Sequence, residues 1–137
     1  MIVYDLDGNE YNWQLVGHKI NIARAKSSLH LRARALLSQL YPTLQILEEV
    51  PINVHRSEVL YLDLYLPLKK LCVETHGPQH YKFVAHYHNN ALGFMRHKKR
   101  DREKQEWCEI NGITLVELPF DESDEQWLNK LKPLENN

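Results

Sequence analysis

The sequence predicts an α/β fold in which a mixed central sheet is flanked by helices. Segments in which apolar and polar residues alternate, as in strands with one buried face, are interleaved with segments whose apolar residues recur every three or four positions, as in helices. The resulting order is hairpin, helix, three strands, helix, strand and helix. With 137 residues and a hydrophobic fraction of 43%, the chain has room for a single domain with one core.

The first element is predicted to be a hairpin, because an Asp7-Gly8 pair lies between the apolar segments 2–4 and 11–15. Residues 1–9 carry two aspartates and no basic residue, unlike a secretory signal. No apolar run approaches the length that a membrane span needs. We therefore expect a cytoplasmic protein with no membrane partner.

A helix follows the hairpin, with Ser27 or Ser28 as its N-cap and its end before Pro42. Its apolar residues recur at helical spacing and are Leu29, Ala33, Leu36, Leu37 and Leu40. This stripe is predicted to pack on the sheet. His30 and Arg34 lie one turn apart beside it.

The next segment, residues 44–54, is predicted to be a strand. Its alternating apolar residues are Leu44, Ile46, Val50, Ile52 and Val54. Glu48 and Glu49 are embedded in it, and adjacent strand residues point to opposite faces. One of these two glutamates could therefore join a polar site, but the sequence does not say which.

Two further strands are predicted to form a hairpin around a loop at residues 67–70. Leu60, Leu62, Leu64 and Leu66 alternate with Tyr61, Asp63 and Tyr65, and Leu71, Val73 and Thr75 alternate with Cys72, Glu74 and His76. If Leu66 lies opposite Leu71, the antiparallel register places Asp63 directly across from Glu74. Two carboxylates are then neighbours on one face of the sheet.

Like charges directly opposite each other on paired strands destabilise a sheet. Either a shared proton or a bound cation would relieve the repulsion. Mg²⁺ takes oxygen ligands and is commonly held by one or two carboxylates together with substrate phosphate oxygens. The predicted pair of acids therefore indicates a metal site and favours phosphodiester chemistry.

A second long helix is predicted over residues 94–110, ending at Gly112 in a left-handed cap. A strand over 113–118 and a short helix over 125–131 follow. Residues 81–92 have no clean period and are expected to form a long loop or a short irregular helix.

The second helix has a mixed face. Phe94, His97, Asp101, Lys104 and Cys108 share it, because they are spaced by three or four residues. A helix that covered only core would carry leucines there. We therefore expect the middle of this face to border a polar cavity, although an ordinary surface ion pair between Asp101 and Lys104 is the simpler alternative.

Two histidines are expected at the same place as the acids. His76 follows Glu74 by two residues, and His80 comes after a Gly-Pro turn that would fold it back toward the strand end. A histidine whose pKa is near neutrality can deprotonate water or protonate a leaving oxygen. A zinc site is an alternative, with ligands from Cys72, His76, His80 or Cys108 and more imidazoles from His86, His88 and His97, but the spacing matches no closed zinc pattern.

The net charge and the cysteine content limit the kinds of protein that this sequence can encode. The formal net charge of −1 excludes a uniformly basic coat for nucleic acid. Basic residues nevertheless cluster in two places, Lys19, Arg24, Lys26, Arg32 and Arg34 early and Arg96, Lys98, Lys99, Arg100, Arg102 and Lys104 late. These clusters could contact phosphate, or they could be ordinary solvated helix faces. Two cysteines in apolar segments give no indication of a disulfide framework.

The pattern of strand, Asp63, hairpin, Glu74-x-His76, helix and strand resembles the core of the PD-(D/E)xK nucleases, with His76 where lysine usually stands. Asp63, Thr75-His76-Gly77, His80 and Asp101 resemble more specifically the very-short-patch repair endonucleases and the EDxHD homing endonucleases of phages. The resemblance covers residues 27–118. It implies a restriction-endonuclease-like core at 25–119, within one nuclease domain that has an N-terminal hairpin extension at 1–24 and a C-terminal tail at 120–137.

The resemblance also implies roles for individual residues. Mg²⁺, for which Mn²⁺ would substitute, would be held by Asp63, Glu74 and the Thr75 carbonyl. His76 would activate water, and His80 would serve the phosphate or the leaving group. Asp101 and Lys104 would position a histidine and a phosphate oxygen. His30 stands where the repair enzymes have a glutamate, and Glu49 could supply that acid instead. DNA would be the partner, contacted by Arg34, Lys98, Lys99 and Arg100.

The expected function is that of a metal-dependent DNA endonuclease, similar to a homing or repair enzyme, acting as a monomer or homodimer in the cytoplasm, or in the host cytoplasm if a phage encodes it. A nuclease for branched DNA or Holliday junctions on the same core is one alternative. A non-catalytic DNA-binding protein that has kept the nuclease fold is another. A zinc-dependent hydrolase is a third.

Overall fold

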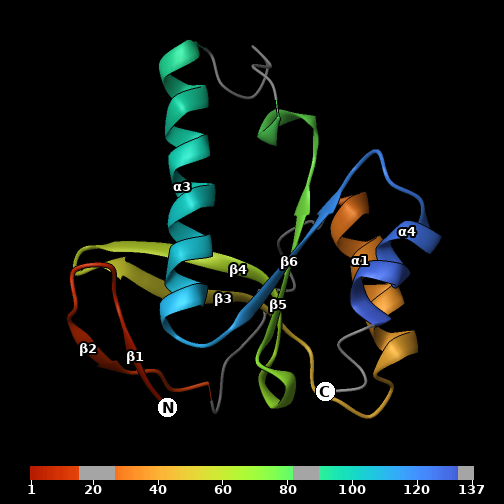
Figure 1. Cartoon of the computed structure of the whole chain (residues 1–137), viewed down its shortest axis with the longest axis horizontal. Helices are drawn as coiled ribbons and strands as arrows, with labels where there is room; N and C mark the ends of the chain where they lie inside the picture. Colours follow the sequence, from red (N-terminus) through yellow and green to blue (C-terminus); the bar gives the residue numbers. More distant parts are fainter. Residues whose placement is uncertain (16–26, 82–89, 133–137) are drawn as a thin grey trace.

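The fold consists of a four-stranded mixed sheet, a separate two-stranded hairpin and helices packed against them (Figure 1). The computed structural model describes residues 1–15, 27–81 and 90–132. The elements are β1 (Ile2–Tyr4), β2 (Glu10–Asn12), α1 (Ser28–Leu40), β3 (Leu47–His55), β4 (Glu58–Leu66), η1 (Pro67–Lys69), β5 (Leu71–His76), η2 (Pro78–His80), α3 (Ala91–Ile110), β6 (Thr114–Pro119) and α4 (Asp124–Leu131). This order confirms the predicted sequence of elements and the α/β class.

The main sheet has the strand order β3-β4-β5-β6. β3, β4 and β5 are antiparallel neighbours, whereas β6 runs parallel to β5 after the chain has passed through α3. The sheet is therefore mixed, as predicted. Pro51, which cannot donate a ladder hydrogen bond, lies in β3 at the edge of the sheet, where a proline is tolerated.

The helix boundaries follow from their caps. Ser27 caps α1 by accepting a hydrogen bond from the backbone N–H of His30, which confirms the predicted start. Asn90 caps α3 in the same way, so this helix begins at Ala91 and not at the predicted Phe94. The end of α3 is as predicted, because Gly112 adopts a left-handed φ of 69°.

The strand before the β4–β5 hairpin is shorter than predicted. Leu44 and Ile46 lie ahead of β3 and pack against the core beside α1. The backbone N–H of Leu44 donates to the carbonyl of Tyr41, so a turn after α1 occupies the beginning of the predicted strand.

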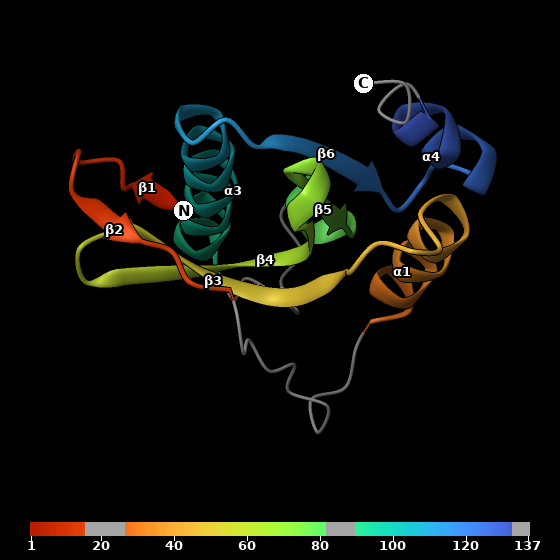
Figure 2. The same cartoon turned by 90° about the horizontal axis from the view of Figure 1, so that it is seen from below.

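The buried apolar residues form two clusters, although the sequence predicted one core. The first cluster joins α3 and the hairpin to β3 and β4 around Trp107, and the second joins α1 and α4 to β5 and β6 around Trp127. Figure 2 shows α3 and the hairpin on one side of the sheet and α1 and α4 on the other. The C-terminal segment is thus part of the fold, since Trp127 is fully buried.

The leucines of β4 change cluster at Asp63. Leu60 and Leu62 belong to the first cluster, and Leu64 and Leu66 belong to the second. The four leucines were predicted to share one buried face, but Tyr65 belongs to the first cluster, so the alternation of β4 changes phase between Leu62 and Leu64. The irregularity lies across from Glu49 of β3, which has a left-handed φ of 52°. Asp63 therefore lies at the boundary between the cores.

Several predicted features fall outside the described residues. They are the basic residues Lys19, Arg24 and Lys26, the histidines His86 and His88, most of the 81–92 loop and the chain end after Lys132.

The β1–β2 turn is held by one buried acid whose charge should matter for stability. The Asp5 carboxylate accepts hydrogen bonds from the backbone of Asp7 and from Asn9 and Tyr11. Burial alone would raise the pKa of Asp5, but these hydrogen bonds together lower it from 3.8 to about 2. A carboxyl whose pKa is lower in the folded state contributes stability above its ordinary pKa and loses it as the pH falls.

We expect Asp5→Asn to lower the melting temperature at pH 7, because an amide nitrogen cannot accept the hydrogen bonds from Asn9 and Tyr11. The difference from the parent protein should shrink as the pH falls from about 4 to about 2, where the parent carboxyl is protonated as well. Thermal denaturation followed by circular dichroism measures this. A difference of the same size at both pH values would contradict the assignment.

Candidate functional site

Four acidic residues, one from each strand of the main sheet, form a row across it. Leu66 lies opposite Leu71, as predicted, and continuing this register by one step beyond Leu64 and Val73 brings Asp63 opposite Glu74. Glu74 is in turn paired with Glu117 on β6. On the other side, the pairs that flank Glu49 place it opposite Asp63. The row is therefore Glu49, Asp63, Glu74 and Glu117.

The two central acids hold β4 and β5 together where the backbone ladder stops. Glu74 Oε2 accepts a hydrogen bond of 2.6 Å from the backbone N–H of Asp63, and Asp63 Oδ2 accepts one of 3.1 Å from the backbone N–H of Thr75. Each carboxylate thus replaces the partner that the opposite strand would have offered. This reciprocal pairing fixes both side chains and lets the strands separate.

Lys104 on α3 supplies a cation to this pair. Its Nζ lies 2.7 Å from Glu74 Oε1, and the Glu74 side chain is 3% exposed. Burial and the charge of Asp63 raise the pKa of Glu74 to about 7. Burial acts to lower the pKa of Lys104, but the charges of Glu74 and Asp63 outweigh it and raise that pKa to about 12. Lys104 thus supplies part of the positive charge that the two opposed carboxylates require.

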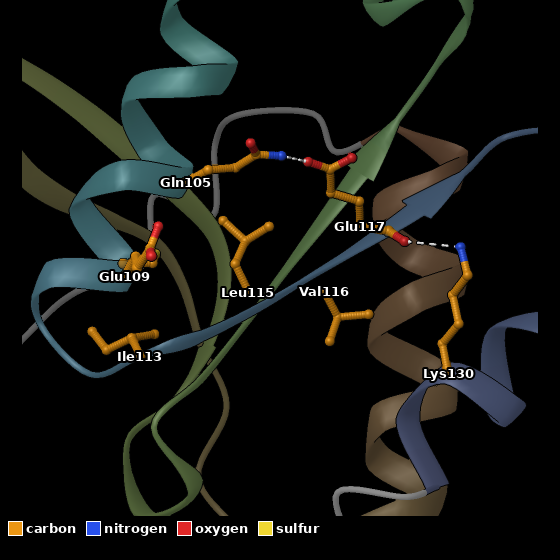
Figure 3. Close-up of a pocket in the computed structure, with 8 residues that line it drawn as sticks. Gln105, Glu109, Ile113, Leu115, Val116, Glu117 and Lys130 are labelled. Atoms are coloured by element: carbon orange, nitrogen blue, oxygen red, sulfur yellow. Dashed lines mark hydrogen bonds between the residues drawn. The ribbon is translucent and has the colours of Figure 1, made fainter.

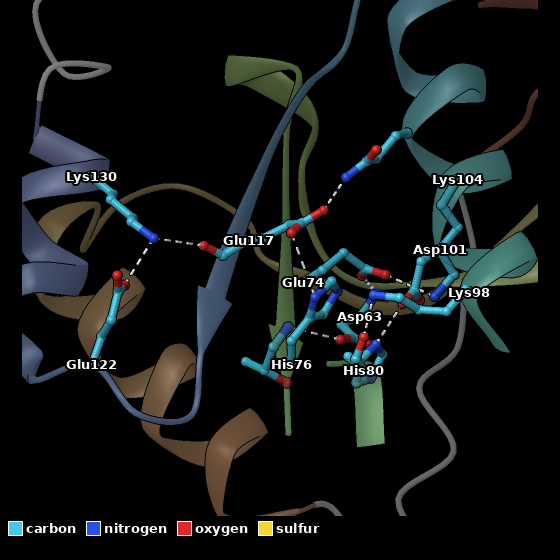
Figure 4. A network of polar contacts seen from close by, with 12 residues as sticks. Asp63, Glu74, His76, His80, Lys98, Asp101, Lys104, Glu117, Glu122 and Lys130 are labelled. Carbon is cyan, nitrogen blue, oxygen red and sulfur yellow. Dashed lines mark hydrogen bonds and ion pairs between the residues drawn. The ribbon is translucent and has the colours of Figure 1, made fainter. Parts of the chain in front are cut away.

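The histidines lie beside the acids, on the elements that follow Glu74 (Figure 4). The rings of His76 and His80 are stacked, with centroids 4.0 Å apart and planes 4° from parallel. His97 of α3 packs edge-on against His80 at 4.3 Å. Burial, together with the nearby charge of His80, lowers the pKa of His76 to about 4, so this ring is neutral near pH 7.

Asp101 orients the second histidine. Its Oδ2 lies 2.8 Å from His80 Nδ1. Burial alone would raise the pKa of Asp101, but the hydrogen bond with His80 and the charges of the neighbouring imidazoles lower it. Asp101 is therefore an anion that holds the proton of His80 on Nδ1 and leaves Nε2 as an acceptor.

Asp63, Lys104, His80, His97 and Asp101 line one pocket of about 400 Å³ between α3 and the sheet. Glu74 and His76 are buried beside it and are not among its lining residues. Its lining residues are Glu49, Val59, Leu60, Tyr61, Asp63, His80, His97, Arg100, Asp101 and Lys104. The prediction that the mixed face of the second helix borders a polar cavity is confirmed for His97, Asp101 and Lys104. Cys108, from the same predicted face, is buried and lines a different pocket.

Two of the predicted site residues lie elsewhere. His30 Nε2 lies 2.6 Å from Glu48 Oε1, and Arg34 Nη1 donates to both oxygens of the same carboxylate. Neither residue lines the pocket around Asp63. Glu48 therefore binds two side chains of α1. Its neighbour Glu49 is the one of the two adjacent glutamates that lines the pocket.

Two of the three predicted phosphate-binding residues of α3 lie at the pocket or beside it. Arg100 lines it, and Lys98 Nζ donates to the backbone carbonyl of His80. Lys98, Lys99 and Arg100 are all exposed, near the N-terminal half of the helix. Positive charge is thus available at the mouth of a pocket whose interior holds carboxylates.

Glu117 was missed by the sequence analysis. It lies in an apolar strand, and its only sequence signal is a charged residue embedded in that strand. Its Oε2 lies 3.6 Å from His76 Nδ1, and Gln105 donates a hydrogen bond to its Oε1. Glu117 therefore lies beside His76 and is not among the residues that line the pocket around Asp63.

A second pocket, of about 630 Å³, lies between α3, β6 and α4 (Figure 3). Its floor is formed by Ile113, Leu115 and Val116, and Glu117 lies at its edge. No histidine is among the described residues that line it. The smaller pocket is the candidate active site, because acids, imidazoles and cations converge there.

Asp63 is the best candidate for a metal ligand. It is partly exposed and lines the pocket. The N–H and C=O of one strand residue point to the same side, so the Thr75 carbonyl faces β4 along with the N–H that Asp63 binds. Both oxygens of Glu74 already accept hydrogen bonds, so Glu74 would coordinate an ion only if Lys104 moved.

The stacked histidines are poorly arranged to chelate one ion. His76, His80 and Asp101 bring potential ligand atoms within 4.8 Å of one another. A metal lies close to the plane of the imidazole that binds it, ~2.0–2.1 Å from the nitrogen. Two parallel planes do not meet at one ion, so one ring would have to rotate. No cysteine belongs to such a group among the described residues, and burial raises the pKa of the Cys72 thiol well above its usual range.

Three relatives match parts of the chain. Uncharacterized protein 307L of Invertebrate iridescent virus 6 is 44% identical over 77 residues, which are 55% of this chain and 39% of the relative. Uncharacterized protein 033L of Invertebrate iridescent virus 3 is 38% identical over 61 residues, 44% of this chain and 31% of the relative. Uncharacterized protein 094L of Frog virus 3 (isolate Goorha) is 33% identical over 82 residues, 58% of this chain and 53% of the relative.

The alignments therefore span between 31% and 53% of the length of these relatives. No family model and no solved structure matches the chain. All three relatives come from viruses named for invertebrates or frogs and none from a phage, so they do not support the predicted phage origin. Over the part of the chain that the structure describes, no helix combines the length and apolar character of a membrane span.

The ion pair between Lys104 and Glu74 gives a prediction about stability in the presence of a chelator. Lys104→Met should lower the free energy of unfolding at pH 8 by about 3 kcal/mol, because it leaves a buried carboxylate without its cation. The loss should be smaller at pH 5, below the pKa of about 7 of Glu74, where that carboxyl is protonated. Urea denaturation measures both values.

The matched control is Lys99→Met, an exposed residue of the same helix, which should change stability by less than about 0.5 kcal/mol. The double variant Lys104→Met/Glu74→Gln should regain part of the loss, since no unpaired charge remains. Additive losses in the double variant would show that the two side chains are not coupled.

Proposed function

We propose that the protein is a metal-dependent endonuclease that hydrolyses phosphodiester bonds of DNA. The observation that carries the proposal is the reciprocal pairing of Asp63 with Glu74 at a point where the strands separate, beside the stacked pair of His76 and His80. A site that combines fixed carboxylates, imidazoles and a half-buried lysine suits the attack of water on a phosphate, because each charge state in that reaction has a complementary group.

Mg²⁺ is the proposed cofactor, with Mn²⁺ as a substitute. Asp63 and the Thr75 carbonyl would hold it, with Glu74 as a further ligand after displacement of Lys104. Oxygen donors from one or two carboxylates and a carbonyl suit a hard divalent ion that keeps some of its waters. When bound, such an ion polarises a phosphoryl oxygen and lowers the pKa of its water.

His76 is proposed to take the proton from the attacking water. Its low pKa leaves it unprotonated near pH 7, so its acceptor nitrogen is available. Glu117 lies beside Nδ1, which favours a proton on that nitrogen and a lone pair on Nε2. The ring is buried between Glu117 and His80 and can turn little, which preserves this orientation.

The dyad of His80 and Asp101 is proposed to serve the phosphate or the leaving oxygen. Asp101 would stabilise the imidazolium form of His80 as a proton passes through it, since it accepts the hydrogen bond from Nδ1. Lys104 is close to the same pocket and would contact a phosphate oxygen when it leaves Glu74.

The backbone of DNA is proposed to lie along the exposed N-terminal half of α3. Lys98, Lys99 and Arg100 carry three adjacent positive charges there, and Arg100 also lines the pocket. Phosphate contacts of this kind position the nucleic acid without reading its sequence. His30 and Arg34, which bind Glu48, are assigned a structural role and not a place on this surface.

The assignment is consistent with the resemblance to the PD-(D/E)xK nucleases and, within them, to the very-short-patch repair and EDxHD homing endonucleases. In that comparison Asp63, Glu74, Thr75, His76, His80 and Asp101 occupy motif positions, and Glu49 lines the pocket where the first acid of the motif is missing from α1. Cleavage assays with duplex, single-stranded and branched DNA distinguish these three forms of substrate.

Cleavage of DNA tests the proposal. With Mg²⁺, the purified chain should nick or cut at least one of supercoiled, single-stranded or four-way-junction DNA, and a chelator should abolish the cleavage. Asp63→Asn and His76→Ala should each reduce the rate by at least about 100-fold, because they remove the metal ligand and the proposed base.

The matched control is Glu109→Gln, an exposed acid near the end of the same helix and outside the site, which should retain full activity. Circular dichroism establishes that each variant is folded. Cleavage by Asp63→Asn or His76→Ala at the parent rate would overturn the residue roles. Absence of cleavage of every substrate by the folded parent chain with Mg²⁺ or Mn²⁺ would overturn the function.

A further inference from the structure

A second cluster of ionisable groups lies at the far end of the main sheet from β6, at the turn between β3 and β4. His55 ends β3, Glu58 begins β4, and the two residues are paired across the turn. Glu103 reaches this turn from α3, and Asp7 reaches it from the β1–β2 turn. Three parts of the chain, the β1–β2 turn, the β3–β4 turn and α3, therefore meet at one imidazole. Figures 1 and 2 show these elements side by side.

The contacts of His55 occupy both of its ring nitrogens. Nδ1 lies 2.8 Å from Asp7 Oδ2, and Nε2 lies 2.5 Å from Glu103 Oε2. A ligand oxygen of Glu58 completes a set of three groups whose ligand atoms lie within 4.8 Å of one another. None of His55, Glu58 and Glu103 lines the pocket around Asp63.

The carboxylate of Glu103 has hydrogen-bonding capacity that the described residues do not use. The residue is 5% exposed, and its Oε1 is a buried atom with no hydrogen-bond partner among the described residues. A buried carboxylate oxygen without a partner costs free energy comparable to a lost hydrogen bond or more. Glu58, next to it, makes no side-chain hydrogen bond to the residues that the structure describes. Glu58 and Glu103 thus both bring a carboxylate oxygen near the same imidazole, and each has oxygen capacity that the described residues leave unused.

We propose that His55, Glu58 and Glu103 form a second divalent metal site, suited to Zn²⁺, with Asp7 as the carboxylate that orients the histidine. Metal-binding histidines commonly donate their other ring N–H to a carboxylate, which fixes the tautomer. With an ion bound, Nδ1–H would donate to Asp7, which would leave the lone pair of Nε2 for the metal. One nitrogen and two carboxylates make a three-ligand set with an open position, as in zinc sites that retain a water.

The arrangement in the structure is close to that geometry but must open slightly. Ligand atoms at 2.0–2.1 Å from a tetrahedral zinc are about 3.3 Å apart, compared with 2.5 Å between Nε2 and Oε2 of Glu103. Without a metal, a second proton on His55 would join the two carboxylates instead. Arg56 does not neutralise these two carboxylates, because its guanidinium donates a hydrogen bond to Asn9.

The inference does not depend on the proposed nuclease activity, because the two sites share no ligand. Its consequence is structural. An ion bound here would join the β3–β4 turn to α3, with Asp7 linking the β1–β2 hairpin to it through His55, so binding should stabilise the fold.

Calorimetric titration of metal-free protein with ZnCl₂ tests the site. The parent chain and Asp63→Asn should bind Zn²⁺ at this site, and Glu58→Gln should bind it at least about tenfold more weakly. Glu58 is partly exposed and lies beside a turn, so this variant should fold, which circular dichroism establishes. Zn²⁺ should raise the melting temperature of the parent and of Asp63→Asn, but much less that of Glu58→Gln.

His80→Asn is the matched control, because it removes an imidazole from the other cluster. Zinc binding that is unchanged in His80→Asn and weakened in Glu58→Gln supports the proposal. Loss of binding in His80→Asn with retention in Glu58→Gln would assign zinc to the stacked histidines and overturn it. Absence of zinc binding by the parent chain would overturn it as well.

Discussion

The reciprocal hydrogen bonds between Asp63 and Glu74 are the constraint on which the rest of the site depends. Two like charges face each other across adjacent strands, and the compensation within the sheet comes from the backbone N–H groups of Asp63 and Thr75 and from the Cys72 thiol. The negative charge that remains is balanced by Lys104, which links α3 to β5 through its ion pair with Glu74. The charge balance of one strand pair therefore helps to position the long helix, together with the packing of Trp107 in the first core.

This constraint also explains why a polar pocket can exist inside so small a fold. The apolar residues divide into two clusters, and the leucines of β4 change from one to the other at Asp63. A charged group at the boundary between two cores needs to displace no packed side chain. The elements on the two sides, α3 for the first core and α1 with α4 for the second, can then be held rigidly while the site between them stays open to solvent.

Much of this was predictable from the sequence, because alternation over β4 and β5 and the short loop between them determine the register that pairs Asp63 with Glu74. Spacing along α3 likewise predicted which of its polar residues border a cavity. The contacts that individual polar side chains make in the folded protein were not predictable from the sequence. His30 and Arg34 share a helix face with the predicted stripe, but only the tertiary fold directs both to Glu48, and the left-handed φ of 52° at Glu49 has no signal in the sequence. Glu117 was missed because one acid in an apolar strand is unremarkable until β6 is placed beside β5.

The central claim is that the opposed acids form a binding site for a divalent ion as well as a structural link. Crystals soaked in Mn²⁺ and measured for anomalous scattering test it most directly. The account predicts a manganese peak within coordination distance of the Asp63 carboxylate, on the side of β5 that faces β4. Well-ordered Asp63 and Glu74 side chains with no peak between β4 and β5, and with Lys104 still bound to Glu74, would contradict it.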